Sequence, residues 1–213
     1  MPMLILSVAV MQPQHIALAA QPEAITQTII ASSSIPEVPF YSQFKDITSP
    51  SWQKVGCGIA SLAMVVDYYQ SAVPVDTLLT EGVAKGAYLK NAGWTYKGLI
   101  SVAKNHGLTG ESFDLGKSNT KTAFTEFKKS LKDGPVIASV HYKFDPKSTI
   151  PHLVVITGIE GDTLYYNDPA AKTGEKKIST KEFLAAWKKR FIVIRPKAEA
   201  LSVASLSFTS NTN

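Results

Sequence analysis

Apolar residues recur along the middle of the chain with two different periods. From Cys57 to Tyr69 (CGIASLAMVVDYY) they occupy nearly every side of a helix, which predicts a helix that is buried all round. Residues 135–142 (PVIASVHY) and 152–159 (HLVVITGI) are rich in β-branched and apolar residues instead. This composition is typical of strands in a packed sheet.

Further segments have the spacing of shorter helices with one apolar side. Several begin beside a hydroxyl or acidic residue, which can accept a hydrogen bond from the first helical turn, and two stop before a glycine. The predicted helices cover residues 74–86, 95–105 and 120–132, and a last one runs from Ser179 or Thr180 to about Lys189. A strand over 191–196 (FIVIRP) closes the pattern.

The clearest local signal is a hairpin. Its first strand, 152–159, is followed by Glu160-Gly161-Asp162 and by a second strand, 163–168 (TLYYND). Residue 152 then lies opposite residue 169 or 170, so Asp168 comes within reach of His152 on the neighbouring strand. A shift of one residue in the register would bring Asn167 there instead.

Helices come first in the chain and strands later, which predicts an α+β fold with an antiparallel sheet. We expect this domain over residues 36–197, after a polar linker over 21–35 and before a flexible tail over 198–213. Residues 1–20 resemble a weak export signal, because an apolar stretch precedes a small-x-small cleavage site at Ala17-Leu18-Ala19. The basic start of such a signal is missing. An exported location is therefore the expectation, and a cytoplasmic one stays open.

Composition excludes several functional classes. The 213 residues are 45% hydrophobic and 18% charged, as in a globular protein. One cysteine excludes an intramolecular disulfide and a cysteine-cluster metal site. The sequence contains no phosphate-binding loop, dinucleotide fingerprint or HExxH motif. No apolar run approaches the ~18 residues of a membrane helix. We therefore expect no cofactor, no metal and no transmembrane segment.

The positive charge is confined to the predicted domain. Only Glu23 and Glu199 of the 17 acidic residues lie outside residues 35–197, which also hold all 22 basic residues. Such a surplus suits anionic partners. The lysines are not interleaved with aromatic residues, as a single-strand-binding surface requires, so we expect no nucleic-acid partner.

Cys57 is the first candidate for chemistry. It lies between Gly56 and Gly58 at the start of the predicted buried helix, where free N–H groups and a partial positive charge favour a thiolate. A lone cysteine in an apolar segment is also a common core residue. The predicted hairpin adds a base, His152, and a carboxylate to orient it, Asp168. Cys–His–Asp is the arrangement of an activated nucleophile.

Acyl transfer also needs donors for the oxyanion. One is the backbone N–H of Cys57, and the other is usually a side-chain amide upstream. Gln43 and Gln53 are the candidates, and Asn167 is the alternative to Asp168 as the orienting residue.

Four segments together resemble a known family: VPFYSQ (38–43), GCGIASLAMVVDYY (56–69), HLVVITGI (152–159) and YYNDPA (165–170). They are similar to papain-superfamily cysteine peptidases, and most to the stand-alone relatives of the bacteriocin-processing, double-glycine leader peptidases (peptidase family thirty-nine-like). The resemblance implies a papain-like fold, in which a helical half carries the cysteine and an antiparallel β half carries the histidine and the aspartate.

The resemblance implies a role for each candidate residue. Cys57 is the nucleophile, His152 the base and Asp168 the orienting residue, with Gln43 preferred to Gln53 as the oxyanion donor. Leader peptidases typically have an acid before the cysteine and a glutamine six residues upstream, where this chain has Gly56 and Ser51.

The expected activity is hydrolysis of a peptide or protein substrate through a thioester acyl-enzyme. Two alternatives stay open. One is an amidase or acyltransferase acting on cell-wall or modified peptides, and the other is a non-catalytic binding module on the same fold.

Overall fold

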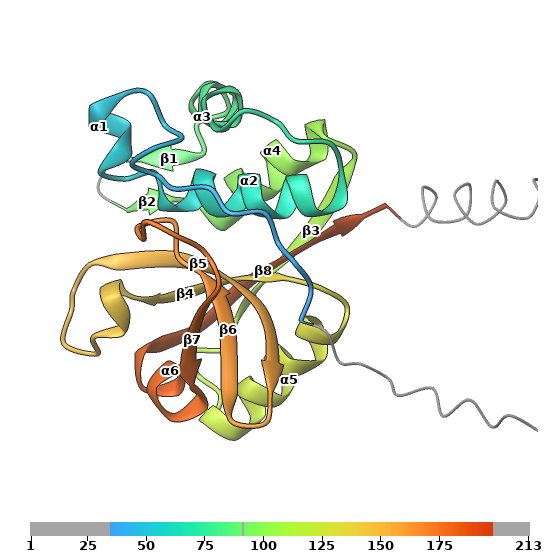
Figure 1. Cartoon of the computed structure of the whole chain (residues 1–213), viewed down its shortest axis with the longest axis vertical. Coiled ribbons are helices and arrows are strands. Elements are labelled where there is room, and N and C mark those ends of the chain that lie inside the picture. The colour runs from blue at the N-terminus through green and yellow to red at the C-terminus, as the bar shows by residue number, and fades with distance from the viewer. Residues whose placement is uncertain (1–34, 91, 198–213) are drawn as a thin grey trace, which may run out of the picture. The chain divides into compact units, whose positions relative to one another are not determined.

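Figure 1 shows a computed structural model of the chain, which describes residues 35–90 and 92–197. The predicted export signal, nearly all of the predicted linker and the predicted tail lie outside these residues. Within the described ranges, no helix has the length and apolar character needed to cross a membrane.

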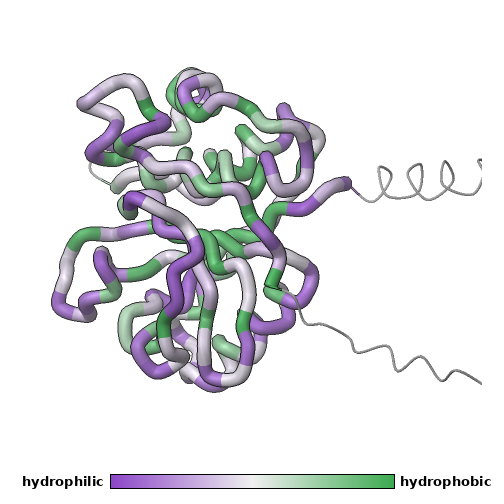
Figure 2. Tube along the Cα trace, viewed as in Figure 1, coloured by the Kyte–Doolittle hydropathy of each residue, from purple (hydrophilic) through white to green (hydrophobic). Residues whose placement is uncertain are grey.

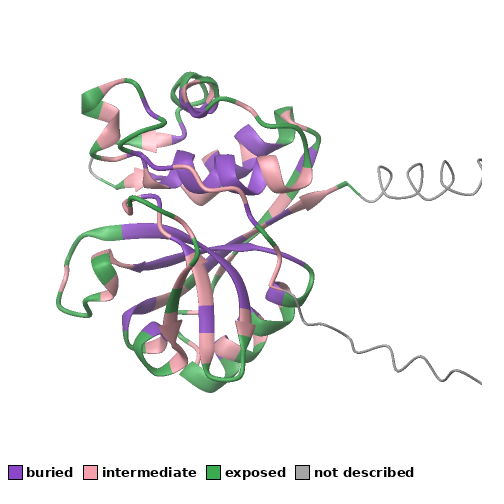
Figure 3. Ribbon diagram, viewed as in Figure 1, coloured by how far each residue is buried: buried purple, intermediate pink, exposed green. Residues whose placement is uncertain are grey.

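The helical half is built around one buried helix, α2 (Cys57–Tyr69). Its residues from Gly58 to Val66 are all buried, as Figure 3 shows, so the expectation of burial on every side is confirmed. Around it lie α1 (Pro50–Gln53), α3 (Val75–Ala84), α4 (Tyr96–Asn105) and a two-stranded ladder of β1 (Tyr88–Leu89) and β2 (Gly93–Trp94).

The β half is a six-stranded sheet whose neighbouring strands all run antiparallel, in the spatial order β3-β8-β4-β5-β6-β7. Two helices and a short 3-10 turn complete this half. The strands are β3 (Leu108–Asp114), β4 (Val136–His141), β5 (Pro151–Glu160), β6 (Thr163–Asn167), β7 (Lys176–Ser179) and β8 (Trp187–Pro196), and the helical elements are α5 (Thr120–Lys132), η1 (Tyr142–Phe144) and α6 (Thr180–Ala186).

The sheet separates two apolar clusters because successive side chains of a strand point to opposite faces. On one face, Ile137 of β4 and Val155 of β5 pack with the residues of α2 and α4. On the other face, Val154 of β5 packs with Phe127 of α5 and Phe183 of α6. Strands that are buried on both faces read as unbroken apolar runs, and Figure 2 shows such runs in the centre of the molecule.

The predicted α+β class with an antiparallel sheet is confirmed, and several details differ. The last helix ends at Ala186 rather than near Lys189, because Trp187 already pairs with Val140 as the first residue of β8. Strand β3 was not predicted. Its sequence, LTGESFD, is mostly polar, and at the edge of the sheet it needs no continuous apolar pattern.

Candidate active site

Cys57 is the first residue of α2, and close packing explains the glycine on each side of it. A Cβ atom at position 56 would collide with Ile47 and would lie 3.3 Å from Cβ of Gln43. A Cβ atom at position 58 would lie 2.7 Å from Cγ of Trp94. The Gly-Cys-Gly sequence therefore lets two neighbouring segments approach the start of the helix while the thiol stays half-buried.

His152 and Asp168 come from the predicted hairpin, and they meet. The Nε2 atom of His152 lies 2.6 Å from Oδ1 of Asp168. The histidine is 3% exposed, and the ring of Tyr142 stands edge-on to it with the centroids 5.3 Å apart. The backbone N–H of Ala170 also donates to Oδ1 of Asp168, at 2.8 Å. This turn fixes the carboxylate just beyond the end of β6.

Asn167, the alternative orienting residue, points elsewhere. Its Nδ2 donates to the carbonyl of Val38 at 2.9 Å, and its Oδ1 accepts from the backbone N–H of Glu175 at 2.8 Å. With both polar atoms engaged and 1% exposure, Asn167 holds the backbone around β6. The structure therefore brings Asp168, and not Asn167, to His152.

The charge of His152 reflects a competition between burial and partners. Burial alone would lower its pKa. Hydrogen bonds to Asp168 and Cys57, together with the charges of those groups, outweigh burial and raise the pKa of His152 to about 9. Because Nε2 is engaged with Asp168, Nδ1 is the ring nitrogen left for Cys57. The geometry favours an imidazolium between a carboxylate and the sulfur.

The two candidate glutamines have different partners. Gln43 is 5% exposed, and its Nε2 donates one of its two N–H bonds to the carbonyl of Gln53 at 2.7 Å. Its Oε1 is buried and has no hydrogen-bond partner in the described part of the chain. The Nε2 of Gln53 donates to the carbonyl of Ile47 at 2.8 Å. Gln43 thus lies against Gly56, and the second N–H of its side-chain amide remains available.

A short connection fixes Gln43 relative to the β half. The backbone N–H of Gln43 donates to the carbonyl of Pro169 at 2.8 Å, and Oγ of Ser42 donates to the carbonyl of Ala171 at 3.2 Å. The glutamine is therefore tied to the same turn that holds Asp168. Cys57, His152, Asp168 and Gln43 form one connected site.

The sequence model of the Peptidase C39 like family matches residues 35–191. The chain belongs to this family. The resemblance drawn from the four sequence segments is confirmed. The comparison with curated proteins finds no match.

Solved structures of C39 peptidase domains share the fold of this C39-like chain. A double glycine motif protease from an AMS/PCAT transporter, in complex with its leader peptide, is 24% identical with a TM-score of 0.54, over 78% of this chain and 96% of that one. A Bacillus anthracis protein described as a C39-like peptidase is 20% identical with a TM-score of 0.56, over 76% and 96%. The peptidase domain of Streptococcus ComA, a bi-functional ABC transporter, is 23% identical with a TM-score of 0.52, over 68% and 93%. The papain-like fold is confirmed.

Two tyrosines near the site of this C39-like domain were missed in the sequence. Tyr142 follows two residues after Val140, which pairs with His152, so correct pairing of β4 with β5 would have found it. Tyr96 opens α4. Burial raises its pKa, and a hydrogen bond to Ser139 and the charge of Arg190 oppose this. The charges of Asp114 and Cys57 add smaller upward effects. Only the packing of α4 beside α2 brings Tyr96 there.

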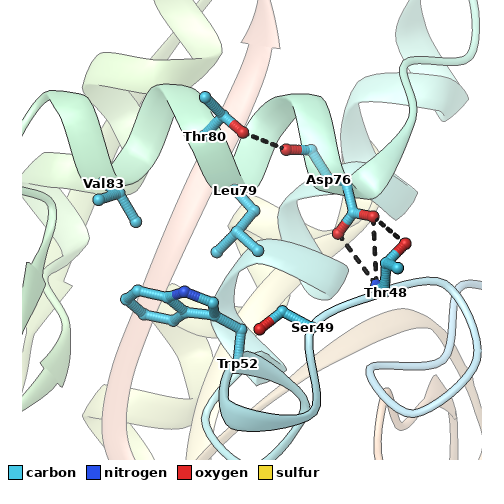
Figure 4. A pocket seen from close by; sticks show the side chains of 7 residues that line it. All are labelled: Thr48, Ser49, Trp52, Asp76, Leu79, Thr80 and Val83. Carbon is cyan, nitrogen blue, oxygen red and sulfur yellow. Dashed lines mark hydrogen bonds between the residues drawn. The ribbon is translucent and has the colours of Figure 1, made fainter.

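A hollow of the helical half lies away from this site. It has a volume of about 460 Å³ and is bordered by Trp52, by one side of α3 and by the loop before α1 (Figure 4). Asp76 accepts hydrogen bonds there from the backbone N–H and the hydroxyl of Thr48. Neither Cys57 nor His152 lines it. Among residues 35–90 and 92–197, no group of His, Cys, Asp and Glu side chains is suited to hold a metal ion.

Proposed function

We propose that this C39-like domain is a cysteine peptidase with Cys57 as nucleophile, His152 as base and Asp168 as orienting residue. One observation carries the proposal: buried His152 is hydrogen-bonded to Asp168 at 2.6 Å, and Cys57 lies near enough to help raise the pKa of the histidine. An imidazole held between a thiol and a carboxylate has its tautomer fixed and its protonated form stabilised. This is the arrangement that activates a cysteine for attack on a carbonyl carbon.

In the proposed reaction, the thiol proton of Cys57 already resides on His152, as the raised pKa of the histidine favours, and the thiolate attacks the carbonyl carbon of a peptide bond. The imidazolium then gives its proton to the departing amine, so the C–N bond breaks and a thioester remains. His152 next takes a proton from water, and the resulting hydroxide attacks the thioester. The acid product leaves, and the thiolate of Cys57 and the imidazolium of His152 are restored.

The proposed oxyanion donors are the backbone N–H of Cys57 and the Nε2 of Gln43. The first N–H groups of a helix have no partner within it, which frees that of Cys57. The contact between Gln43 and Gly56 and the remaining N–H of Gln43 support its role. The engagement of Gln53 with Ile47 argues against Gln53. Two such donors lower the energy of a tetrahedral intermediate.

We propose a peptide or protein as the substrate. The family and the complex of one structural neighbour with its leader peptide support this class. Gly56, where leader peptidases have an acid, fits the close contacts with Ile47 and Gln43, which leave no room for a side chain. Export of the protein stays a proposal that depends on residues 1–20.

Thiol alkylation tests the proposal directly, because Cys57 is the one cysteine of the chain. The rate of reaction with iodoacetamide is measured from pH 5 to 10 for the wild type, His152→Ala and Asp168→Ala. We expect the wild type to stay reactive well below pH 8 and the His152 variant to lose that reactivity. Hydrolysis of a denatured protein substrate, followed by mass spectrometry, should disappear in Cys57→Ser.

Two results would count against a peptidase. A wild-type profile that matches that of His152→Ala means that the thiol is not activated. An activated thiol that cleaves no peptide bond, but transfers an acyl group to an added amine, would indicate an acyltransferase instead.

A further inference from the structure

A second groove lies at one edge of the six-stranded sheet, beside the edge strand β3. Beyond β3 the described residues contain no further strand, while α4 runs beside it (Figure 1). The groove between them has a volume of about 430 Å³. It is lined by Lys97, Ile100, Ser101 and Lys104 of α4 and by Gly110, Glu111 and Ser112 of β3.

The ladder shows which backbone groups of β3 face this groove. Leu115 N–H donates to the carbonyl of Lys189, so that pair is hydrogen-bonded. In an antiparallel ladder such pairs alternate with pairs that are not hydrogen-bonded. By this alternation, the backbone N–H and C=O groups of Glu111 point to β8. Those of Gly110, which is opposite Ile194, and of Ser112, which is opposite Ile192, point away from β8. The two residues with free backbone groups thus line the groove.

Gly110 keeps this edge accessible. A Cβ atom there would lie 2.8 Å from the carbonyl oxygen of Val193 and 3.1 Å from Cγ1 of Ile100. A larger residue would push α4 and β3 apart or fill the groove. The apolar floor is Ile100, which is 9% exposed.

The groove carries a positive rim. Lys97 and Lys104 are exposed and lie two helical turns apart, so they project from one side of α4. Neither forms an ion pair with any described residue. Glu111 is the one acid among the lining residues, and its side chain points to the sheet face opposite that of Gly110 and Ser112.

We propose that this groove is a second peptide-binding site, which takes an extended acidic segment as an added strand along β3. Outward N–H and C=O groups of Gly110 and Ser112 supply main-chain hydrogen bonds, and Lys97 and Lys104 select carboxylate side chains. Strand addition to a free sheet edge is a general way to bind a peptide with little demand on its sequence. None of Cys57, His152, Asp168 and Gln43 lines the groove, so binding does not depend on the proposed chemistry.

The test is fluorescence anisotropy of a labelled eight-residue peptide of alternating Glu and Val, with a Lys–Val peptide as its counterpart. The full chain is used after alkylation of Cys57, which prevents cleavage. We expect the Glu peptide to bind at least about tenfold more tightly than the Lys peptide, with affinity falling as salt rises. The pair Lys97→Glu and Lys104→Glu should weaken binding by at least about tenfold. Lys85→Glu with Lys128→Glu, an equal charge change outside the groove, should weaken it far less.

Ser112 separates strand addition from simple charge attraction. Ser112→Pro removes an outward N–H without removing a bond to β8, whereas Ser112→Ala removes only the hydroxyl. We expect the proline variant to lose several-fold in affinity and the alanine variant to bind as the wild type, with the circular dichroism spectrum of both unchanged. Equal binding of both peptides, no loss in the lysine variants, or equal effects of the two Ser112 variants would overturn the proposal. Displacement of the peptide by a Cys57-directed peptidyl inhibitor on the unalkylated protein would also overturn it, by placing the peptide in the other site.

Discussion

The imidazole of His152 meets the carboxylate of Asp168 at 2.6 Å, although the two residues are not paired in the sheet. The ladder between β5 and β6 joins Gly158 to Tyr165 and then Ile156 to Tyr166, so Thr157 is an extra residue. A bulge of this kind shifts all later pairs by one position.

That shift decides which side chain accompanies His152. Without the bulge, Asn167 would pair with Ile156, whose side chain points to the same face as that of His152. With it, Asn167 pairs with Val155 and turns to the opposite face, and Asp168 takes the position on the histidine's face. One additional residue in β5 therefore exchanges an amide for a carboxylate beside the imidazole.

Asp168→Asn should separate the charge of the carboxylate from its position. The amide oxygen can still accept from His152, but the negative charge that helps to raise the pKa of His152 is gone. We expect kcat/KM for a peptide substrate to fall by at least about tenfold, and the alkylation profile of Cys57 to lose reactivity at low pH. Equal activity of Asp168→Asn and wild type would show that the charge is dispensable.

Asn167→Ala is the matched control for that experiment, because Asn167 is the residue next to Asp168. It removes two buried hydrogen bonds, to Val38 and Glu175, and should lower the free energy of unfolding by roughly 2–4 kcal/mol. Urea denaturation measures the loss. At a temperature where the variant is folded, the pH profile of thiol alkylation should keep its wild-type form.

Much of the fold could be predicted from the sequence where local signals and packing agree. The predicted bounds of α5 are those observed, because Oδ1 of Asn119 caps its first turn at 2.9 Å from the N–H of Thr122 and its apolar side is regular. The edge strands β3 and β7 were missed. Their sequences, LTGESFD and KKIS, contain few apolar residues, so they show no regular apolar–polar alternation.

For the candidate site too, local features could be predicted from the sequence and long-range contacts could not. A short hairpin is a local feature, so the approach of His152 to Asp168 could be predicted, but the bulge at Thr157 that selects Asp168 over Asn167 leaves no sequence signal. The position of Gln43 depends on its contact with Pro169, more than a hundred residues away in the chain. Contacts of that kind arise only in the assembled fold.

The raised pKa of His152 makes stability depend on pH. A group whose pKa is higher in the folded state stabilises that state fully below its unfolded pKa, here 6.5, and the contribution is lost as pH rises through about 9. For buried His152 the shift corresponds to about 3 kcal/mol. The wild type should therefore lose stability between pH 6.5 and 9 in urea titrations, and His152→Ala should lack this loss. Cys57→Ser should show a smaller loss, since Cys57 is one of the two partners that raise the pKa. A flat wild-type profile would contradict the imidazolium.

Gln43→Ala tests the proposed oxyanion donor separately from the nucleophile. Removing one such donor typically lowers kcat by about 10²-fold or more. The alkylation rate of Cys57 should change little, because iodoacetamide forms no tetrahedral oxyanion. Gln53→Ala is the matched control: it removes the bond to Ile47 and should affect stability more than kcat. A larger drop in kcat for Gln53→Ala than for Gln43→Ala would reverse the assignment.

Gly58→Ala tests the packing that frames the cysteine. The new methyl group would lie 2.7 Å from Cγ of Trp94, whose ring is held by a 2.7 Å hydrogen bond from Nε1 to the carbonyl of Val55. Because the indole cannot shift without breaking that bond, we expect a loss of about 1–3 kcal/mol in unfolding free energy. Gly116→Ala, on the surface with only Asp114 nearby, should cost less than about 1 kcal/mol. Equal losses for the two variants, measured by thermal and urea denaturation, would mean that Trp94 moves freely and that the helix start is less tightly held than its contacts indicate.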